Sequence, residues 1–302
     1  MPWPVGEGTA VEMKVLFTIA TLEAAIRLSI PVALAALGAL LSERTGVLNL
    51  GLEGMMLSGA FAGYTANEMT GSPWVGLLAG IVVGCAFGAL LALAVVTIRA
   101  NQVVTGIAFT LLASSGTTYL FQLKYSIGQK PPRVERLGMP PLVAITLACV
   151  AALWFLFQRT TVGLAMAATG ESPEAADALG YRVVRLRWIA TTIGGGLAGL
   201  GGAALTCGPL GLFIRNVTAG RGWVALALVV FAGWRPGTAV AGAFLFGLCD
   251  ACQLRLQGTK TEIPYEVFLA LPYMVTLAAL VLRARASRTP AALAIPFVRG
   301  AH

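Results

Sequence analysis

The amino-acid sequence predicts an all-α fold, a polytopic bundle of transmembrane helices, and three observations support this prediction. Hydrophobic residues make up 57% of the 302 residues and charged residues only 11%, whereas about 25% of a typical soluble domain is charged. The mean hydropathy is +0.81. Long apolar stretches approach the roughly 20 residues that a helix needs to cross a bilayer, and the alternating segments of a membrane β-barrel are not seen. We therefore expect one integral-membrane domain over residues 1–302.

Nine apolar segments are expected to enter the membrane. The seventh is too short for a straight crossing, so we expect a half-helix that turns at Trp234-Arg235-Pro236-Gly237. The number of membrane segments is therefore eight or nine. The expected segments are residues 15–41, 47–67, 74–98, 102–122, 141–158, 188–206, 222–234, 237–254 and 264–282.

The connection at residues 159–187 differs from the others because it is long, polar and charged. We place it in the cytoplasm with the Arg-bearing tail at 283–302, and alternation puts 42–46, 99–101 and 235–236 on the same side. Loops on the two sides carry Lys and Arg in similar numbers, so this orientation depends on the 159–187 loop more than on the positive-inside rule. The net charge of +8 lies largely in these short connections, which indicates membrane orientation and not nucleic-acid binding.

Glycines recur every fourth residue in the third predicted span, at Gly76, Gly80, Gly84 and Gly88. Small residues at this spacing let two helix backbones approach closely, and the sixth span repeats the pattern at Gly195 and Gly199. Residues 194–199 also match the G-x-G-x-x-G pattern, but that pattern indicates dinucleotide binding only between a strand and a helix. We therefore assign these glycines to packing. The sequence also has no G-x-x-x-x-G-K-[ST] motif for ATP.

Few carboxylates fall within the predicted spans, namely Glu23, Glu53, Asp250 and Glu266. Glu23 and Arg27 have the i, i+4 spacing of a helical ion pair, and lining of a substrate path is the alternative for these two residues. Asn49 and Glu53 have the same spacing on the second span. A carboxylate at that depth is costly unless it is paired or hydrated, so Glu53 either accepts a structural hydrogen bond or, with Asn49, lines a substrate path.

Hydroxyl side chains give the fourth predicted span a polar but uncharged character. They can hydrogen-bond to the backbone or to another helix, and they can also line a route for a polar solute. Both interpretations stay open for this group, within which Thr105, Ser114 and Thr118 are the candidate path residues; its other members are Thr110, Ser115 and Thr117.

No catalytic or metal-binding residue is predicted. Cys249-Asp250-Ala251-Cys252 forms a C-x-x-C motif at the end of an apolar span, but the chain has no second Cys pair. Its one His, His302, is the last residue. A four-ligand zinc site is therefore hard to assemble, and a Ser-His-Asp triad is not indicated.

Residues 172–180 of the polar loop are predicted to form a complete short helix. Ser172 is a good N-cap and Pro173 suits the first helical position. Glu174 complements the positive end of the helix dipole, and Gly180 suits the left-handed position after the last turn. A self-capped helix outside the membrane is well suited to docking in a groove of another protein.

Two segments resemble those of known transporters. Glu174-Ala175-Ala176-Asp177-Ala178-Leu179-Gly180 fits the E-A-A-x-x-x-G core of ABC-importer permeases. The run from Ser42 to Met56, S-E-R-T-G-V-L-N-L-G-L-E-G-M-M, is similar to the branched-chain amino acid/simple-sugar permease family, and closest to its nucleoside and simple-sugar branch. The stretch G-W-R-P-G-T-A-V-A-G-A-F-L-F-G is similar to that branch too. The resemblance covers about residues 20–282 and departs at Arg187-Trp188-Ile189-Ala190, where some importers have I-x-L-P.

The resemblance implies a permease subunit of an ABC importer in a prokaryotic inner (plasma) membrane. Such a chain binds no cofactor, and a partner ATP-binding subunit uses the ATP. The other implied partners are a second permease subunit of a different chain, an extracytoplasmic solute-binding protein and membrane lipid. ATP-driven closure is expected to pull on the 172–180 helix and switch the path by alternating access. The implied coupling residues are Glu171, Ser172, Pro173, Glu174, Ala175, Ala176 and Gly180.

The expected cargo is a small neutral polar solute, because the spans carry hydroxyls and few charges. The resemblance implies that this solute is a nucleoside, with a simple sugar as the second choice. The alternative is a secondary transporter or channel that works without an ATPase, although ion-coupled transporters often use several intramembrane carboxylates. An intramembrane enzyme is a further alternative, and it would need a reactive cluster built from the C-x-x-C motif or the scattered carboxylates.

Overall fold

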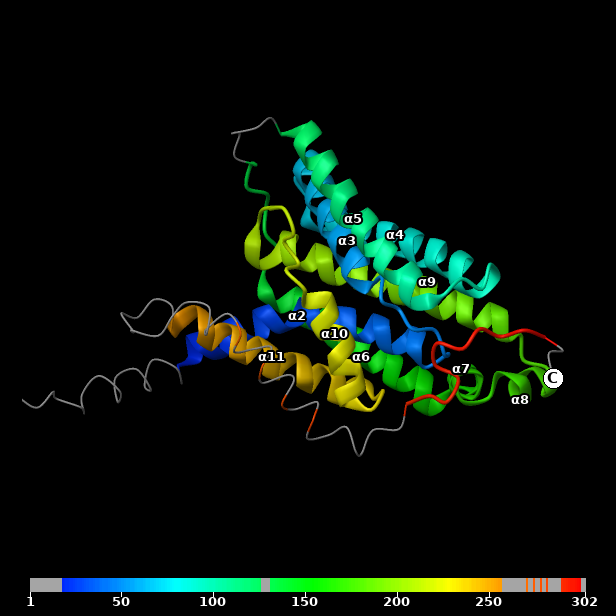
Figure 1. Cartoon of the computed structure of the whole chain (residues 1–302). Coiled ribbons are helices and arrows are strands. Elements are labelled where there is room, and N and C mark those ends of the chain that lie inside the picture. The colour runs from blue at the N-terminus through cyan, green and yellow to red at the C-terminus, as the bar shows by residue number, and fades with distance from the viewer. Residues whose placement is uncertain are drawn as a thin grey trace, which may run out of the picture.

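The computed structural model describes residues 18–125, 131–256 and 289–299, and isolated helical residues at 270, 274, 278 and 281. Within these residues the fold is entirely helical, as predicted (Figure 1). The elements are α2 (Ile19–Glu43), α3 (Leu52–Thr70), α4 (Pro73–Ala92), the π-helical turn η1 (Leu93–Thr97), α5 (Gln102–Lys124), α6 (Met139–Arg159), α7 (Thr161–Glu171), α8 (Pro173–Ala178), α9 (Val183–Leu205), the π-helical turn η2 (Thr206–Leu210), α10 (Arg221–Ala232) and α11 (Pro236–Leu256).

Six helical segments in the described part of the chain are long and apolar enough to cross a membrane. They are α2, α4 with η1, α5, α6, α9 with η2, and α11. The second predicted span corresponds to α3, which has 19 residues but is less apolar. The ninth, 264–282, lies outside the described residues except for four isolated positions. The chain is thus a multi-span helical membrane protein, and the count of eight or nine segments stays a prediction.

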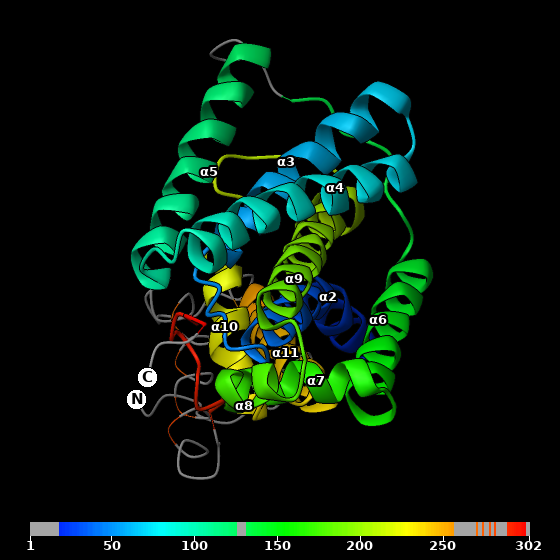
Figure 2. The ribbon, with the colours of Figure 1, turned by 90° about the vertical axis from the view of Figure 1, so that its right-hand side faces the viewer.

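Helix α9 lies at the centre of the bundle, where it packs against α2, α3 and α4 (Figure 2). The contact with α4 depends on glycine at both helices, as the spacing predicts. A Cβ at Gly84 would come within 2.3 Å of the Gly195 carbonyl oxygen, and a Cβ at Gly199 within 2.2 Å of the Gly80 carbonyl oxygen. Real Cβ atoms do not approach a backbone so closely. The predicted packing role of these glycines is therefore confirmed.

The predicted half-helix is α10, whose 12 residues span about 18 Å at ~1.5 Å per residue. That is well short of the ~30 Å hydrocarbon core. The helix ends at Ala232, and the chain reverses through Gly233 and Trp234, both at positive φ (59° and 55°). Helix α11 then begins at Pro236, so the chain turns where the sequence predicts it to turn.

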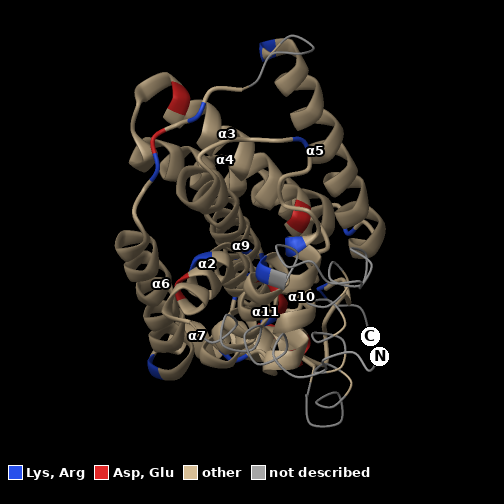
Figure 3. Cartoon of the chain, turned by 90° about the vertical axis from the view of Figure 1, so that its left-hand side faces the viewer, with Lys and Arg blue, Asp and Glu red and all other residues tan. Residues whose placement is uncertain are grey.

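The short helices α7 and α8 lie at one end of the bundle, beside the segment 289–299, coloured red in Figures 1 and 2. The turn after α2 reaches the same end, because the Gly46 carbonyl accepts a hydrogen bond from Ala294 N. The turns at Arg99 and Arg235 also lie there: Arg99 lines a cavity with Asp177, and Arg235 acts electrostatically on Arg44. Most of the helical ribbon carries no charged residue (Figure 3). The connections that the alternating topology puts on the same side of the membrane as the 159–187 loop are thus close in space.

Candidate coupling face and substrate path

The helix predicted at residues 172–180 forms as its sequence indicates. Ser172 is the N-cap, and its hydroxyl accepts a hydrogen bond from Ala175 N at 3.4 Å. Pro173 opens α8, which runs to Ala178. Gly180 follows in the left-handed region at φ +88°, a conformation that favours glycine because it has no Cβ.

One face of α8 packs inward and the rest of it is exposed. Pro173 and Ala176 are buried, whereas Glu174 and Ala175 are exposed. The preceding residues Glu171 and Ser172 are exposed as well, and Leu179 has an exposed fraction of 76%. The predicted coupling residues thus divide between an inward anchor and an outward surface that a partner could contact.

Glu53 is buried, with an exposed fraction of 5%, and its carboxylate binds the first turn of α10 and the residues just before it. Oε1 accepts hydrogen bonds from the Thr218 hydroxyl at 2.5 Å and Gly220 N at 2.9 Å, and Oε2 accepts one from Gly222 N at 2.6 Å. A carboxylate is favourable at a helix N-terminus because the amides there lack partners and carry partial positive charge. Glu53 therefore joins the start of α3 to the start of α10.

The prediction that Asn49 and Glu53 share one helix is wrong. The helix α2 ends at Glu43, Gly46 takes a left-handed conformation at φ +87°, and α3 begins only at Leu52. Asn49 lies in the connection between them, fully buried. Its amide donates to Met55 Sδ at 3.5 Å, and its Oδ1 accepts no hydrogen bond from the described residues.

Two hydroxyls of α5, those of Thr110 and Thr117, hydrogen-bond to backbone carbonyls. The Thr110 hydroxyl donates to the Leu50 carbonyl at 3.2 Å, and the Thr117 hydroxyl to the Ala113 carbonyl at 2.7 Å. Thr105, Ser114 and Thr118 are half-buried. At about 100° per residue, Ser114 and Thr118 share one side of the helix, whereas Thr105 is about 180° from Ser114.

The five candidate path residues therefore do not form one cluster. Asn49 and Glu53 are buried around the start of α3, and the three α5 residues occupy two sides of that helix. Within the described ranges, no hydrogen bond joins any two of the five side chains.

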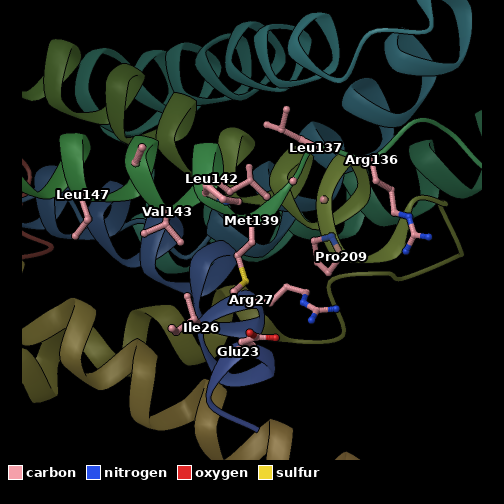
Figure 4. A pocket seen from close by; sticks show the side chains of 14 residues that line it. Glu23, Ile26, Arg27, Arg136, Leu137, Met139, Leu142, Val143, Leu147 and Pro209 are labelled. Carbon is pink, nitrogen blue, oxygen red and sulfur yellow. The ribbon is translucent and has the colours of Figure 1, made fainter. Parts of the chain in front are cut away.

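The predicted ion pair between Glu23 and Arg27 is not formed. The three ion pairs in the described part of the chain are Lys124–Glu68, Arg221–Asp250 and Arg299–Asp177. Glu23 and Arg27 instead line an otherwise largely apolar cavity of about 850 Å³ between α2 and α6 (Figure 4). Both side chains are exposed, and an exposed helical pair gains only about 0.3–0.5 kcal/mol, too little to fix two long side chains in one geometry.

Two long-range contacts of buried acidic residues were not visible in the sequence. Trp234 Nε1 donates to Glu43 Oε2 at 2.8 Å, and Arg221 Nη2 lies 3.0 Å from Asp250 Oδ2. Asp250, inside the C-x-x-C motif, is thus the ion-pair partner of Arg221, the first residue of α10. The two cysteines around it are free thiols.

Comparison with known proteins identifies the family. Residues 21–280 match the family described as branched-chain amino acid transport system / permease component. TsgC13 of Haloferax volcanii, provisionally named a glucose ABC transporter permease protein, is 41% identical over 84% of this chain and 83% of its own. The guanosine ABC transporter permease protein NupQ of Bacillus subtilis is 33% identical over 89% and 93%, and the nucleoside ABC transporter permease protein NupC of Lactococcus lactis is 31% identical over 90% and 94%.

The fold has a counterpart among solved structures. An inward-facing structure, provisionally assigned to a metal-chelate type ABC transporter, superimposes with a TM-score of 0.56. The match covers 93% of this chain and 91% of the other at 20% identity, so it supports the fold alone. With the matching sequence motifs, the six long apolar helices among the described residues and the capped α8 helix, these comparisons show that the chain belongs to the branched-chain amino acid transport system permease family of ABC transporters.

Proposed function

We propose that this chain is the membrane-spanning subunit of an ATP-driven importer and couples to its ATP-binding subunit through α8. The observation that carries the proposal is the form of α8: a self-capped helix at one end of the bundle, anchored by Pro173 and Ala176, with Glu174 and Ala175 exposed. Its E-A-A-x-x-x-G pattern is that of ABC-importer permeases. A second permease chain and an extracytoplasmic solute-binding protein complete the proposed assembly in the inner membrane.

The proposed cargo is a nucleoside or a simple sugar. Relatives named for guanosine, nucleosides and glucose support this class. The described spans are also consistent with an uncharged cargo, because their buried acidic groups already have partners within the protein. Glu53 accepts hydrogen bonds from backbone amides, Glu43 accepts one from Trp234, and Asp250 forms an ion pair with Arg221. Ser114 and Thr118, which share one side of α5, offer hydroxyls to a neutral polar solute.

The direct test is uptake by proteoliposomes that contain the purified complex. We expect ATP-dependent accumulation of labelled guanosine, uridine or glucose, with the solute-binding protein on the outside. Uptake that needs no ATP and no ATP-binding subunit would instead support a secondary transporter or channel.

Gly180 provides a sharper test of the α8 coupling. We expect Gly180→Val to uncouple solute uptake from ATP hydrolysis, because a β-branched residue is strained at φ +88° and the turn after α8 must change. The chain should still reach the membrane, since no atom lies within 4 Å of the added Cβ position.

Gly71→Val is the matched control for this test. Gly71 also has a positive φ, +68°, and no atom within 4 Å of an added Cβ, but it follows α3, at the end of that helix away from the Gly46 turn and α8. Uptake per ATP should be normal in Gly71→Val. Normal uptake per ATP in Gly180→Val would contradict the coupling role of α8.

A further inference from the structure

The C-terminal strap, defined as residues 289–299, connects α8 to the membrane helices. Its backbone makes two hydrogen bonds to separate parts of the bundle end: Ala292 N donates to the Gly170 carbonyl at 2.8 Å, and Ala294 N donates to the Gly46 carbonyl at 3.1 Å. Gly170 lies near the end of α7, and Gly46 lies in the turn after α2. The strap therefore joins the end of α7, directly before the predicted coupling residues, to the turn after α2.

A buried arginine fixes the strap to the start of α9. Arg187 has an exposed fraction of 2%. Its Nε donates to the Thr45 carbonyl at 3.0 Å and its Nη1 to the Ile295 carbonyl at 2.9 Å. One guanidinium thus holds the α2–α3 turn and the strap together, and hydrogen bonds to a charged donor are roughly twice as strong as neutral ones.

Glycine at position 46 is required for this close approach. A Cβ there would lie 2.8 Å from Arg187 Nη2 and 2.9 Å from the Ala292 carbonyl oxygen. The left-handed backbone at Gly46 adds a second reason, since its φ of +87° is unfavourable for other residues. The turn after α2 is therefore shaped to receive both Arg187 and the strap.

The end of the strap contacts α8 itself. Phe297, with an exposed fraction of 9%, forms a small apolar cluster with Ala176 of α8 and Val183 of α9. Arg299 Nε then lies 3.0 Å from Asp177 Oδ2. The inward face of α8 thus packs against the strap as well as against the bundle.

A helix as short as α8 needs such packing to persist. Its six residues fall far below the ~12–15 residues at which an isolated helix becomes even marginally stable in water. Its capping helps, but most helical stability in proteins comes from packing of an apolar face. That face is Pro173 and Ala176, and Phe297 contacts it.

We infer that the C-terminal strap is a positioning element of the coupling device: Phe297 and Arg299 hold α8, while Arg187 and Gly46 tie the strap to the α2–α3 turn and α9. The strap makes α8 and that turn move together when the ATP-binding subunit moves α8. This inference rests on the proposed function of α8 as the coupling helix.

The test compares Phe297→Ala with Val298→Ala in the complete transporter complex. Val298 is the adjacent strap residue and has an exposed fraction of 39%, so its truncation leaves the α8 contact intact. Two quantities are measured: hydrogen–deuterium exchange of the α8 amides, and solute imported per ATP hydrolysed. Both are read on samples with equal membrane levels.

For Phe297→Ala we expect exchange of the Ala176, Leu179 and Gly180 amides to rise at least about fivefold, because local opening becomes easier. We expect solute imported per ATP to fall about fivefold or more, the range of a typical coupling free energy. Val298→Ala should match the wild type in both. Arg299→Ala removes only an exposed ion pair, so this variant should fold normally. It should raise α8 amide exchange and lower solute imported per ATP, each by a smaller factor than Phe297→Ala.

Unchanged exchange of α8 in Phe297→Ala would overturn the inference, whether or not the complex transports. Faster exchange with an unchanged import ratio would overturn it as well, since the strap would then hold α8 without serving coupling. Failure of the proposed function shows separately, as a wild-type complex that neither hydrolyses ATP nor imports solute, and the exchange measurement still decides whether the strap positions α8.

Discussion

At the residue scale, Glu53 is the buried charge with the most complete set of partners. It accepts hydrogen bonds from Thr218, Gly220 and Gly222, and Glu53→Gln would point an amide NH2 group at one of these donors. Because hydrogen bonds to a charged group contribute about 1.5–3 kcal/mol each, we expect Glu53→Gln to destabilise the detergent-solubilised protein by about 2 kcal/mol or more. Thermal unfolding measures this change.

The matched control is Glu135→Gln, an exposed glutamate outside the helices, whose removal should leave the unfolding temperature unchanged. A Glu53→Gln variant as stable as the wild type would show that Glu53 is not a structural carboxylate. It would favour the alternative that Glu53 lines the substrate path, and uptake kinetics of the same variant would then become informative.

The partners of Glu53 also show where sequence reasoning ends. The sequence predicts that a carboxylate at this depth needs a partner, and that prediction is correct. The sequence indicates Asn49 as that partner, one turn away on an assumed helix. The actual donors lie about 165–169 positions further along the chain. The segment Thr218-Ala219-Gly220-Arg221-Gly222 does carry a usable signal, since Gly is among the residues favoured at an N-cap and an apolar run follows. Pairing it with Glu53 requires the tertiary fold.

At the element scale, the sequence is most informative where the signal is local. The N-cap at Ser172 and the left-handed Gly180 depend on residues that are neighbours in the chain, and both form as expected. The turn predicted at Trp234-Arg235-Pro236-Gly237 is also local, and it forms slightly earlier, at Gly233 and Trp234, with α11 beginning at Pro236. Glycine spacing likewise predicts close packing of α4, although not which helix faces it. The predicted start of the second span at residue 47 is too early, because residues 47–51 form an irregular connection before α3, and an apolar run alone does not reveal this.

The α4–α9 contact yields a prediction with two opposing effects. Alanine is favoured over glycine in a helix by about 1 kcal/mol. At Gly199, however, the added methyl group would meet the Gly80 carbonyl oxygen at 2.2 Å and the Gly84 Cα at 2.8 Å. Overpacking of this kind costs about 1–3 kcal/mol or more, and here the obstruction is backbone. We therefore expect Gly199→Ala to lower the unfolding temperature and the yield of folded protein.

Gly116→Ala is the control for this prediction, because no atom lies within 4 Å of a Cβ at Gly116 on α5. It should be neutral or slightly stabilising, by up to about 1 kcal/mol. If Gly199→Ala behaved like Gly116→Ala in the same unfolding assay, α4 and α9 would have to be further apart than the structure has them.

At the scale of the whole molecule, two helices are peripheral and differ in chemistry. Only 17% of the most apolar window of α5 and of α6 is buried, against 78% for α2 and α9. The exposed side of α6 presents Leu147, Trp154 and Phe155, side chains well suited to lipid. The exposed side chains of α5 include Ser115. A hydroxyl that faces lipid can bond only to its own helix, whereas between helices it can hydrogen-bond across the contact.

This difference predicts which side of the chain meets the second permease subunit of the proposed importer. A photo-crosslinking amino acid at position 115 of α5 should join this chain to another membrane-spanning polypeptide in native membranes. The same amino acid at position 147 of α6, where the leucine is 59% exposed, should give adducts with lipid and no second polypeptide. Crosslinks to protein from position 147 alone would assign the contact to α6, and would contradict the assignment of the exposed Ser115 side of α5 to the second permease subunit.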